Sequence, residues 1–231
     1  MKNIIVFIVL LAFLGCTGQK EQAKVSGTSA KDVSAKAVDK VRFEPIDPAR
    51  TDVDPNKIDY EVFNIGEAHI GNVKRYTYNV VVTQRLTKVD FEKIAQTVYE
   101  KAKKDTPFNA LAVGFYDYPE FLREGYRLGW AEFAPNGKWA DAMTVKTGNY
   151  SSIKMTSHLE TPNWDNAITY QEAIILTEFY KLASELSKNA KTGEELNEAE
   201  QKATDAITKK YQISPEAFDE IFFRSIGIMP W

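Results

Sequence analysis

Residues 109–116 read Asn-Ala-Leu-Ala-Val-Gly-Phe-Tyr, an almost wholly apolar run with turn-forming residues on both sides. A strand buried on one face alternates apolar and polar residues, whereas a strand buried on both faces is apolar throughout. We therefore predict that 109–116 is the central strand of a sheet and is covered on both faces or nearly so.

The segments around this run supply the rest of the sheet. Two strands are expected before it, at 60–65 and 75–85, and two after it, at 126–133 and 139–147. The residues Ala-Pro-Asn-Gly-Lys at 134–138 are typical of a tight reversal between the last two strands. In the second strand one face is apolar and the other mostly polar: Tyr76, Tyr78, Val80 and Val82 share the first, and Arg75, Thr77, Asn79 and Thr83 the second.

A helix is expected at 88–104, between the second strand and the central one. Thr87 is followed three residues later by Asp90, which is a capping pattern, and apolar residues then recur at helical spacing from Phe91 to Ala102. The order strand, strand, helix, strand, strand, strand predicts an α+β fold, with a mixed or antiparallel sheet of about five strands and one packed helix.

After a polar connection at 148–166, the sequence predicts three helices. The tetrapeptides at 169–172 and 192–195 each place a glutamate three residues after a threonine, so each opens an amphipathic helix, and we expect the two to pair as an antiparallel hairpin. Ser214-Pro215 begins a further short helix that runs to about Arg224.

The block 60–148 contains FNALAVGFY, which ends at Tyr116, and WAEFAPNGKW at 130–139. With these stretches it resembles small strand-helix-strand-strand domains of unknown function in bacterial and mobile-element proteins. The resemblance implies the fold and brings no catalytic motif with it.

The N-terminus has the pattern of an export signal. Residues 1–16, MKNIIVFIVLLAFLGC, place one lysine before an apolar run from Ile4 to Leu14. Helical residues rise about 1.5 Å each, so this run reaches roughly half of a ~30 Å hydrocarbon layer and fits a signal-peptide core better than a spanning helix. We predict a signal peptide at 1–15.

Phe13-Leu14-Gly15-Cys16 resembles the lipobox of prokaryotic membrane lipoproteins, with Phe13 where that family usually has leucine. The resemblance implies lipidation of the Cys16 thiol, cleavage after Gly15 and acylation of the new amine. Two or three acyl chains, at about 0.8 kcal/mol per buried methylene, form a durable anchor. The alternatives are an ordinary secretory signal with an incidental cysteine and an uncleaved apolar N-terminal helix.

The composition after the signal sets the domain organisation. We expect the lipidated cysteine and a flexible stem at 16–40, which is rich in small and polar residues and has no aromatic residue, then a sheet domain at 41–167 and a helical appendage at 168–231.

Cys16 is the only cysteine, which excludes a disulfide and a cysteine metal site. The net charge of -3 argues against broad nucleic-acid binding, which needs a basic face.

No motif in the sequence specifies catalysis. Two histidines are too few for a usual metal site, although Glu67 and His69 share a face if they lie on a strand. The nucleotide-binding fingerprints and the nucleophile elbow are absent. The acids after the central strand, at 117, 120 and 124, have no fixed separation and read as solvated loop residues. We assign no catalytic residue, no metal and no cofactor.

Aromatic residues are dense around the loops of the predicted sheet. They either fill the core beneath the helices, as aromatic residues usually do, or gather at the surface, where their rings stack on a sugar or peptide or anchor a protein interface. If they are exposed, the candidate ligand- or partner-binding residues are Tyr118, Phe121, Tyr126 and Trp164.

These observations lead to a hypothesis of a non-enzymatic, lipid-anchored envelope protein. It is held in the cell membrane or outer membrane through Cys16, faces the periplasm or exterior, and binds a protein or envelope component. The alternative is an envelope hydrolase that acts on wall or glycan material with loop acids or His158. A structural spacer or a host-interaction lipoprotein is a third possibility.

Overall fold

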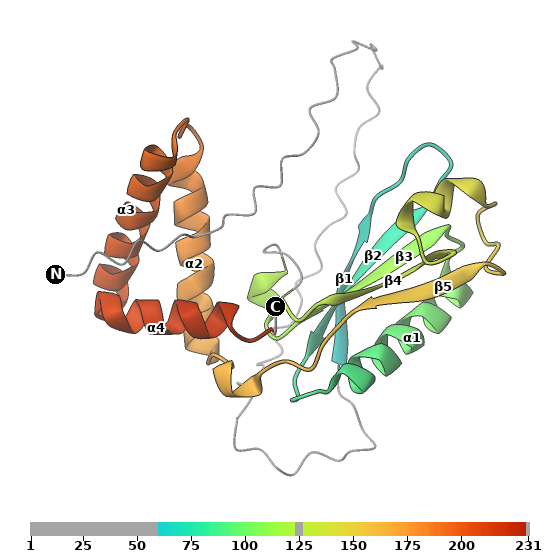
Figure 1. Ribbon diagram of the computed structural model, residues 1–231, viewed down its shortest axis with the longest axis horizontal. Coiled ribbons are helices and arrows are strands. Elements are labelled where there is room, and N and C mark those ends of the chain that lie inside the picture. The colour runs from blue at the N-terminus through green and yellow to red at the C-terminus, as the bar shows by residue number, and fades with distance from the viewer. Residues whose placement is uncertain (1–59, 123–126, 230–231) are drawn as a thin grey trace. The chain divides into compact units, whose positions relative to one another are not determined.

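The computed structural model describes residues 60–122 and 127–229 (Figure 1). Its strands are β1 (Tyr60–Glu67), β2 (Arg75–Val82), β3 (Ala110–Tyr116), β4 (Trp130–Pro135) and β5 (Ile153–His158). Its α-helices are α1 (Lys88–Asp105), α2 (Tyr170–Ser187), α3 (Gly193–Tyr211) and α4 (Pro215–Ile226). Short 3-10 helices lie at Pro119–Phe121 (η1), Trp139–Thr144 (η2) and Trp164–Asn166 (η3).

The strands form one mixed sheet in the order β1-β2-β3-β4-β5. Neighbouring strands are antiparallel except β2 and β3, which are parallel because α1 carries the chain back between them. β3 is the central strand, and every one of its residues is buried. The α+β fold and the doubly covered central strand are therefore confirmed.

β1 and β5 are the two edge strands of this sheet. The pairing of β1 with β2 shifts register between Val62 and Asn64, so β1 carries a bulge in its middle. β5 pairs with β4 without such a shift, from Trp130 opposite His158 to Pro135 opposite Ile153.

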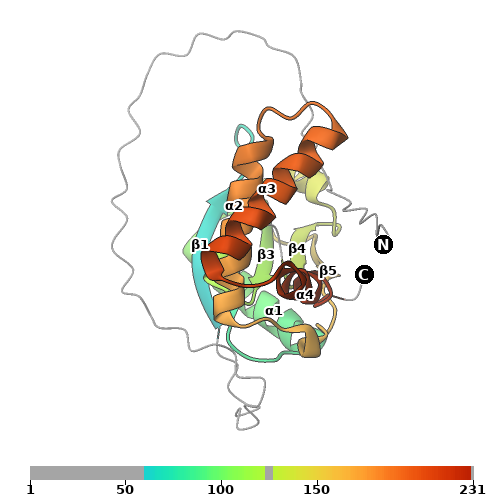
Figure 2. The same ribbon diagram turned by 90° about the vertical axis from the view of Figure 1, so that its left-hand side faces the viewer.

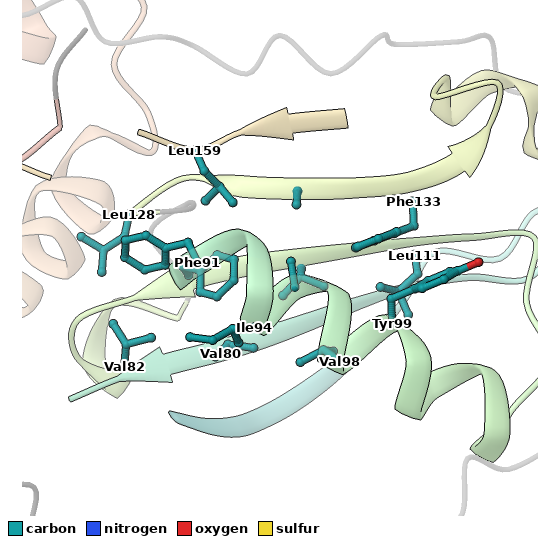
Figure 3. Close-up of a cluster of buried hydrophobic side chains, with 14 of the residues drawn as sticks. Val80, Val82, Phe91, Ile94, Val98, Tyr99, Leu111, Leu128, Phe133 and Leu159 are labelled. Atoms are coloured by element: carbon teal, nitrogen blue, oxygen red, sulfur yellow. The ribbon is translucent and has the colours of Figure 1, made fainter. Parts of the chain in front are cut away.

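Helix α1 covers one face of the sheet, and the side chains between them form the larger core (Figure 3). Its start is fixed by the predicted cap, in which the Thr87 hydroxyl accepts from the backbone N–H of Asp90 and the Asp90 carboxylate accepts from the Thr87 N–H. The predicted apolar positions of α1 all face inward. They meet Val80, Val82, Leu111, Val113, Phe115, Ala131 and Phe133 from the sheet.

The prediction of a strand at 139–147 is wrong, and the polar connection expected at 148–166 contains the last strand instead. The turn itself is present, with positive φ at both Asn136 and Gly137. The chain then forms η2, which buries Ala142 against Ala110 and Ala134, and β5 takes the place beside β4. Short-range pattern could not predict this, because the pairing joins segments separated by a long loop.

The three C-terminal helices are confirmed as a hairpin of α2 and α3 followed by the short α4 (Figure 2). The caps at Thr169, Thr192 and Ser214 all form as predicted. A second core joins these helices to the sheet through Val81 and Tyr116. Within residues 60–122 and 127–229, no helix combines the length and the apolar character needed to cross a membrane.

Tyr99 of α1 makes the stability of the larger core sensitive to alkali. Its ring stacks on Phe133 at 4.4 Å between centroids, and burial raises the pKa of its hydroxyl to about 12. The unfolded chain ionises first, near pH 10, so the contribution of neutral Tyr99 to the free energy of unfolding is complete below pH 10 and is lost as the pH rises to 12. We expect Tyr99→Phe to flatten the fall in stability over this interval in urea titrations. Thr97→Val removes a hydroxyl that does not titrate there, and an equal flattening by this variant would contradict the assignment.

Candidate functional site

The face of the sheet opposite α1 carries polar and aromatic residues beside buried small ones, outside the larger core under α1. Side chains alternate along each strand, so the register shows which residues of β2, β3, β4 and β5 lie on this face. We call it the second face. Its members are Arg75, Thr77 and Asn79 from β2, Ala110, Ala112 and Gly114 from β3, Trp130, Glu132 and Ala134 from β4, and Lys154, Thr156 and His158 from β5.

The middle of the second face is a strip of very small residues. These are Ala110, Ala112 and Gly114 of β3, and all three are buried. Ala112 and Gly114 have larger, mostly polar neighbours on β2 and β4. At one end the strip meets η2, where Ala110 packs with Ala142 and Trp139. At the other end it meets the C-terminal helices, where Tyr116 joins the second core. The strip spans about 13 Å, at ~3.4 Å per residue.

Aromatic and polar groups are held together beside this strip. The rings of Trp130 and His158 stack at 4.5 Å between centroids, with planes 21° apart. The indole N–H of Trp130 donates to the carboxylate of Glu132 at 3.3 Å. Across the strip, the Tyr116 hydroxyl donates to the side-chain oxygen of Asn79 at 3.4 Å. An aromatic ring with a carboxylate and an amide nearby is a common composition for a ligand site.

Arg75 is the most unusual member of the second face. It is only 7% exposed, its Nε atom is buried without a hydrogen-bond partner, and its guanidinium lies 5.7 Å from the centre of the Trp139 ring. Among residues 60–122 and 127–229, no carboxylate lies within ion-pair distance of it. Its main chain is fixed, since the N–H donates to His69 Nδ1 at 3.2 Å and the carbonyl accepts from Ala68 at 3.0 Å.

The acids after β3 form a different cluster, which joins the sheet to the C-terminal helices. The Asp117 carboxylate accepts from Arg127 Nε at 2.8 and 3.1 Å, and the two side chains are 3% and 11% exposed. Arg127 also donates to the Ser225 carbonyl of α4 at 3.1 Å, and its guanidinium lies 4.3 Å from the centre of the Phe121 ring. Asp117 is therefore part of a buried ion pair and not a solvated loop acid.

The next acid of that loop is also occupied. The Tyr170 hydroxyl donates to Glu120 at 2.8 Å, and this hydrogen bond raises the pKa of Tyr170. Arg224 of α4 binds the Glu172 carboxylate and the Ala167 carbonyl in the same region. Glu124, the third acid of the loop, lies outside the described residues.

Of the four aromatic residues named as binding candidates if exposed, Tyr118, Phe121 and Trp164 lie within the described residues. Tyr118 and Phe121 are 3% and 1% exposed, so of the two alternatives these two rings follow the first and fill the core. The Tyr118 hydroxyl donates to the Ile168 carbonyl at 2.7 Å, and burial raises its pKa above the usual range. Trp164 is half-buried against the larger core and donates to the Leu86 carbonyl at 2.9 Å. Tyr126 and Cys16 lie outside the described residues.

His69 and His158 lie in different parts of the structure, each with its own partners. His69 Nε2 lies 3.3 Å from a Glu67 oxygen, and Nδ1 already accepts from the Arg75 N–H. In the part of the chain that the structure describes, no three side chains of the metal-binding types are grouped. His158 lies on β5, two strands from β3, so backbone spacing alone separates it from the Asp117 segment by about 10 Å.

Part of the second face is visible in the sequence. Arg75, Thr77 and Asn79 alternate with the apolar residues of β2 and form the mostly polar face of that strand. The small residues at alternate positions of β3 were the other half of the signal. Only the parallel register of β2 and β3 brings the two halves together.

Comparisons with known proteins add little to this description. No protein-family model matches the sequence. No curated protein gives a significant match. Among solved structures, the chain is similar to a DUF487 family protein from Desulfovibrio piger, with 15% identity, a TM-score of 0.40, and coverage of 68% of this chain and 87% of that one. A similarity at this level carries no argument about function.

The Asp117–Arg127 pair generates a stability prediction. Asp117→Asn is expected to lower the free energy of unfolding by about 3–5 kcal/mol, because it leaves the Arg127 charge buried without its partner. The double variant with Arg127→Met is expected to be more stable than Asp117→Asn alone, as measured by urea denaturation. Glu198→Gln, at an exposed pair with Lys202, is the control and is expected to change stability by less than about 1 kcal/mol. Equal losses from Asp117→Asn and Glu198→Gln would contradict a structural role for the buried pair.

Proposed function

We propose that this chain is a lipid-anchored protein of the cell envelope whose folded part binds a ligand or partner and does not catalyse a reaction. The observation that carries the proposal is the leader at 1–16, which ends at the only cysteine of the chain. Lipid on Cys16 would hold the protein in the cell membrane or outer membrane, facing the periplasm or exterior.

The second face supports the binding part of the proposal. It brings side chains of four strands together on one surface, including the stacked pair of Trp130 and His158 and the polar groups of Asn79 and Glu132. Rigid strands hold these groups in place, which favours recognition of a protein or envelope component.

The arrangement of the loop acids favours binding over the alternative of a hydrolase. A glycoside hydrolase needs two carboxyl groups that reach the same bond, one of them as an acid. The Asp117 carboxylate is held by Arg127 inside the protein, and Glu120 is bonded to Tyr170. Freeing either group would break contacts between the sheet and the C-terminal helices.

Replacement of Cys16 tests the anchor. The wild-type chain is expected in the membrane fraction, with a mature N-terminus at Cys16 that mass spectrometry finds carrying acyl chains. Cys16→Ala removes the thiol and is expected to lose both the lipid and the membrane association, whereas Ser26→Ala in the stem is expected to keep both. Recovery of the wild-type protein in the cytosol, with residues 1–15 still attached and unmodified, would contradict the proposal.

A turnover assay tests the choice between binding and hydrolysis. The full chain in detergent, incubated with purified cell-wall material, is expected to release no soluble sugar or peptide fragments, as measured by chromatography with mass detection. Fragments that appear with the wild-type protein and not with the boiled sample would establish a hydrolase in place of a binding protein. A boiled sample of the same preparation controls for spontaneous release.

A further inference from the structure

The end of the sheet that lies away from the C-terminal helices carries an excess of positive charge. Three segments meet there: the turn between β1 and β2, the last turn of α1, and the loop between β4 and β5 with the first residues of β5 (Figure 1). We call this region the basic end and define it as residues 67–75, 100–105 and 136–154. These segments contain eight lysines and arginines and four acids, a net charge of +4 in a chain whose net charge is -3.

Six lysines of the basic end are exposed, and none of them lies within ion-pair distance of a carboxylate in the part of the chain that the structure describes. They are Lys74, Lys101, Lys104, Lys138, Lys146 and Lys154. Lys103, the seventh, pairs with Glu100 at 3.0 Å. The three remaining acids, Glu67, Asp105 and Asp141, balance only half of the six charges. The excess is not used within the described fold and is available to an anionic partner.

Two exposed apolar side chains lie among these lysines. Ile70, in the turn between β1 and β2, is 57% exposed, and Met143 of η2 is 62% exposed, more than any other large apolar residue that the structure describes. The two loops that carry them are in contact, because Val73 and Trp139 pack on the same small cluster of alanines. Exposed apolar side chains with lysines around them are typical of a surface that contacts an anionic membrane.

A buried asparagine fixes these two loops to each other. Asn109 is only 1% exposed, and its side-chain oxygen accepts from the Lys74 N–H and from the Thr147 hydroxyl, both at 2.8 Å. Its side-chain amide donates to the Val145 carbonyl at 2.8 Å. The exposed groups of the basic end are therefore held on a fixed support, and a surface that is ordered beforehand loses less entropy when it binds.

The length of the chain before β1 lets the basic end reach a membrane that holds Cys16. β1 begins at the opposite end of the sheet, where Tyr60 pairs with Val82. The 43 residues between Cys16 and Tyr60 span at most about 150 Å when extended. The eight residues of β1 measure roughly 27 Å, so the tether is long enough for either end of the sheet to contact the bilayer.

We propose that the basic end contacts a membrane of anionic lipids, with Ile70 and Met143 in the headgroup region and the six lysines on the lipid phosphates. This inference rests on the proposed anchor, which brings the folded part to a membrane, and adds which surface faces the lipid. The C-terminal segment 168–231 has seven basic and eleven acidic residues, a net charge of -4, so an anionic membrane repels that part of the chain. The opposite charges of the two regions favour a single orientation on the bilayer.

A fluorophore at the basic end tests this contact. The full chain is reconstituted in vesicles of phosphatidylcholine, with or without phosphatidylglycerol, and carries an environment-sensitive label at Met143→Cys. We expect its emission to shift to shorter wavelength only with phosphatidylglycerol, and high salt to reduce the shift. The same label at Leu186→Cys, an exposed apolar position near the end of α2, is expected to show no shift. Wild type, treated in the same way, accounts for any label on Cys16.

Charge reversal tests the role of the lysines. Lys74→Glu combined with Lys146→Glu is expected to abolish the shift at position 143, because it turns two of the unpaired cations into anions. Lys188→Glu combined with Lys191→Glu makes the same change in net charge between α2 and α3 and is expected to keep the shift. Circular dichroism checks that both variants are folded. Equal shifts at positions 143 and 186, or a shift that the first pair of changes leaves intact, would overturn the proposal.

Failure of the anchor and failure of the basic end give different results. A chain without lipid does not float with phosphatidylcholine vesicles, whereas an anchored chain whose basic end stays in water floats but shows no shift at position 143. If the lipid is missing, flotation with phosphatidylglycerol vesicles still tests the basic end. It is expected to be lost at high salt and with the changes at Lys74 and Lys146, and its absence would overturn the proposal. A shift at position 143 with soluble polyphosphate but not with phosphatidylglycerol vesicles would overturn the assignment to lipid.

Discussion

The burial of β3 on both faces is the constraint on which the rest of the structure depends. β3 has large apolar residues toward α1 and small residues toward the second face, except for Tyr116 at its end. The large residues require a helix on their side, and α1 supplies it on the way from β2 to the parallel β3. Tyr116 and the segment after it then provide the apolar surface on which the C-terminal helices pack.

The sequence predicted the features that depend on near neighbours. The caps at Thr87, Thr169, Thr192 and Ser214 each involve residues within one helical turn, and all four form. The prediction of a strand at 139–147 is wrong because a short alternating segment is compatible with a strand and with a 3-10 helix. Only its pairing partner decides between them. The segment that pairs with β4 begins at Ile153, and its position depends on long-range contacts that spacing cannot reveal.

The candidate site could not be predicted from the sequence either, because it also depends on long-range contacts. Tyr118 and Phe121 drew attention because aromatic residues in loops often bind ligands, but in this fold they lie under the C-terminal helices. Arg75 was not a candidate, because an arginine that alternates with apolar residues usually points to solvent. Two arginines of similar burial thus have different surroundings: Arg127 has its carboxylate within the chain, and Arg75 has only an aromatic ring.

The bulge in β1 bears on how copies of this protein behave next to one another. An edge strand that is regular and flat offers its backbone groups to the same strand of a neighbour, which leads to aggregation. The shift between Val62 and Asn64 interrupts the regular spacing of β1, and the exposed Lys154 puts a charge on β5 at the opposite edge. Both margins of the sheet therefore resist edge-to-edge pairing with a neighbouring copy of the chain.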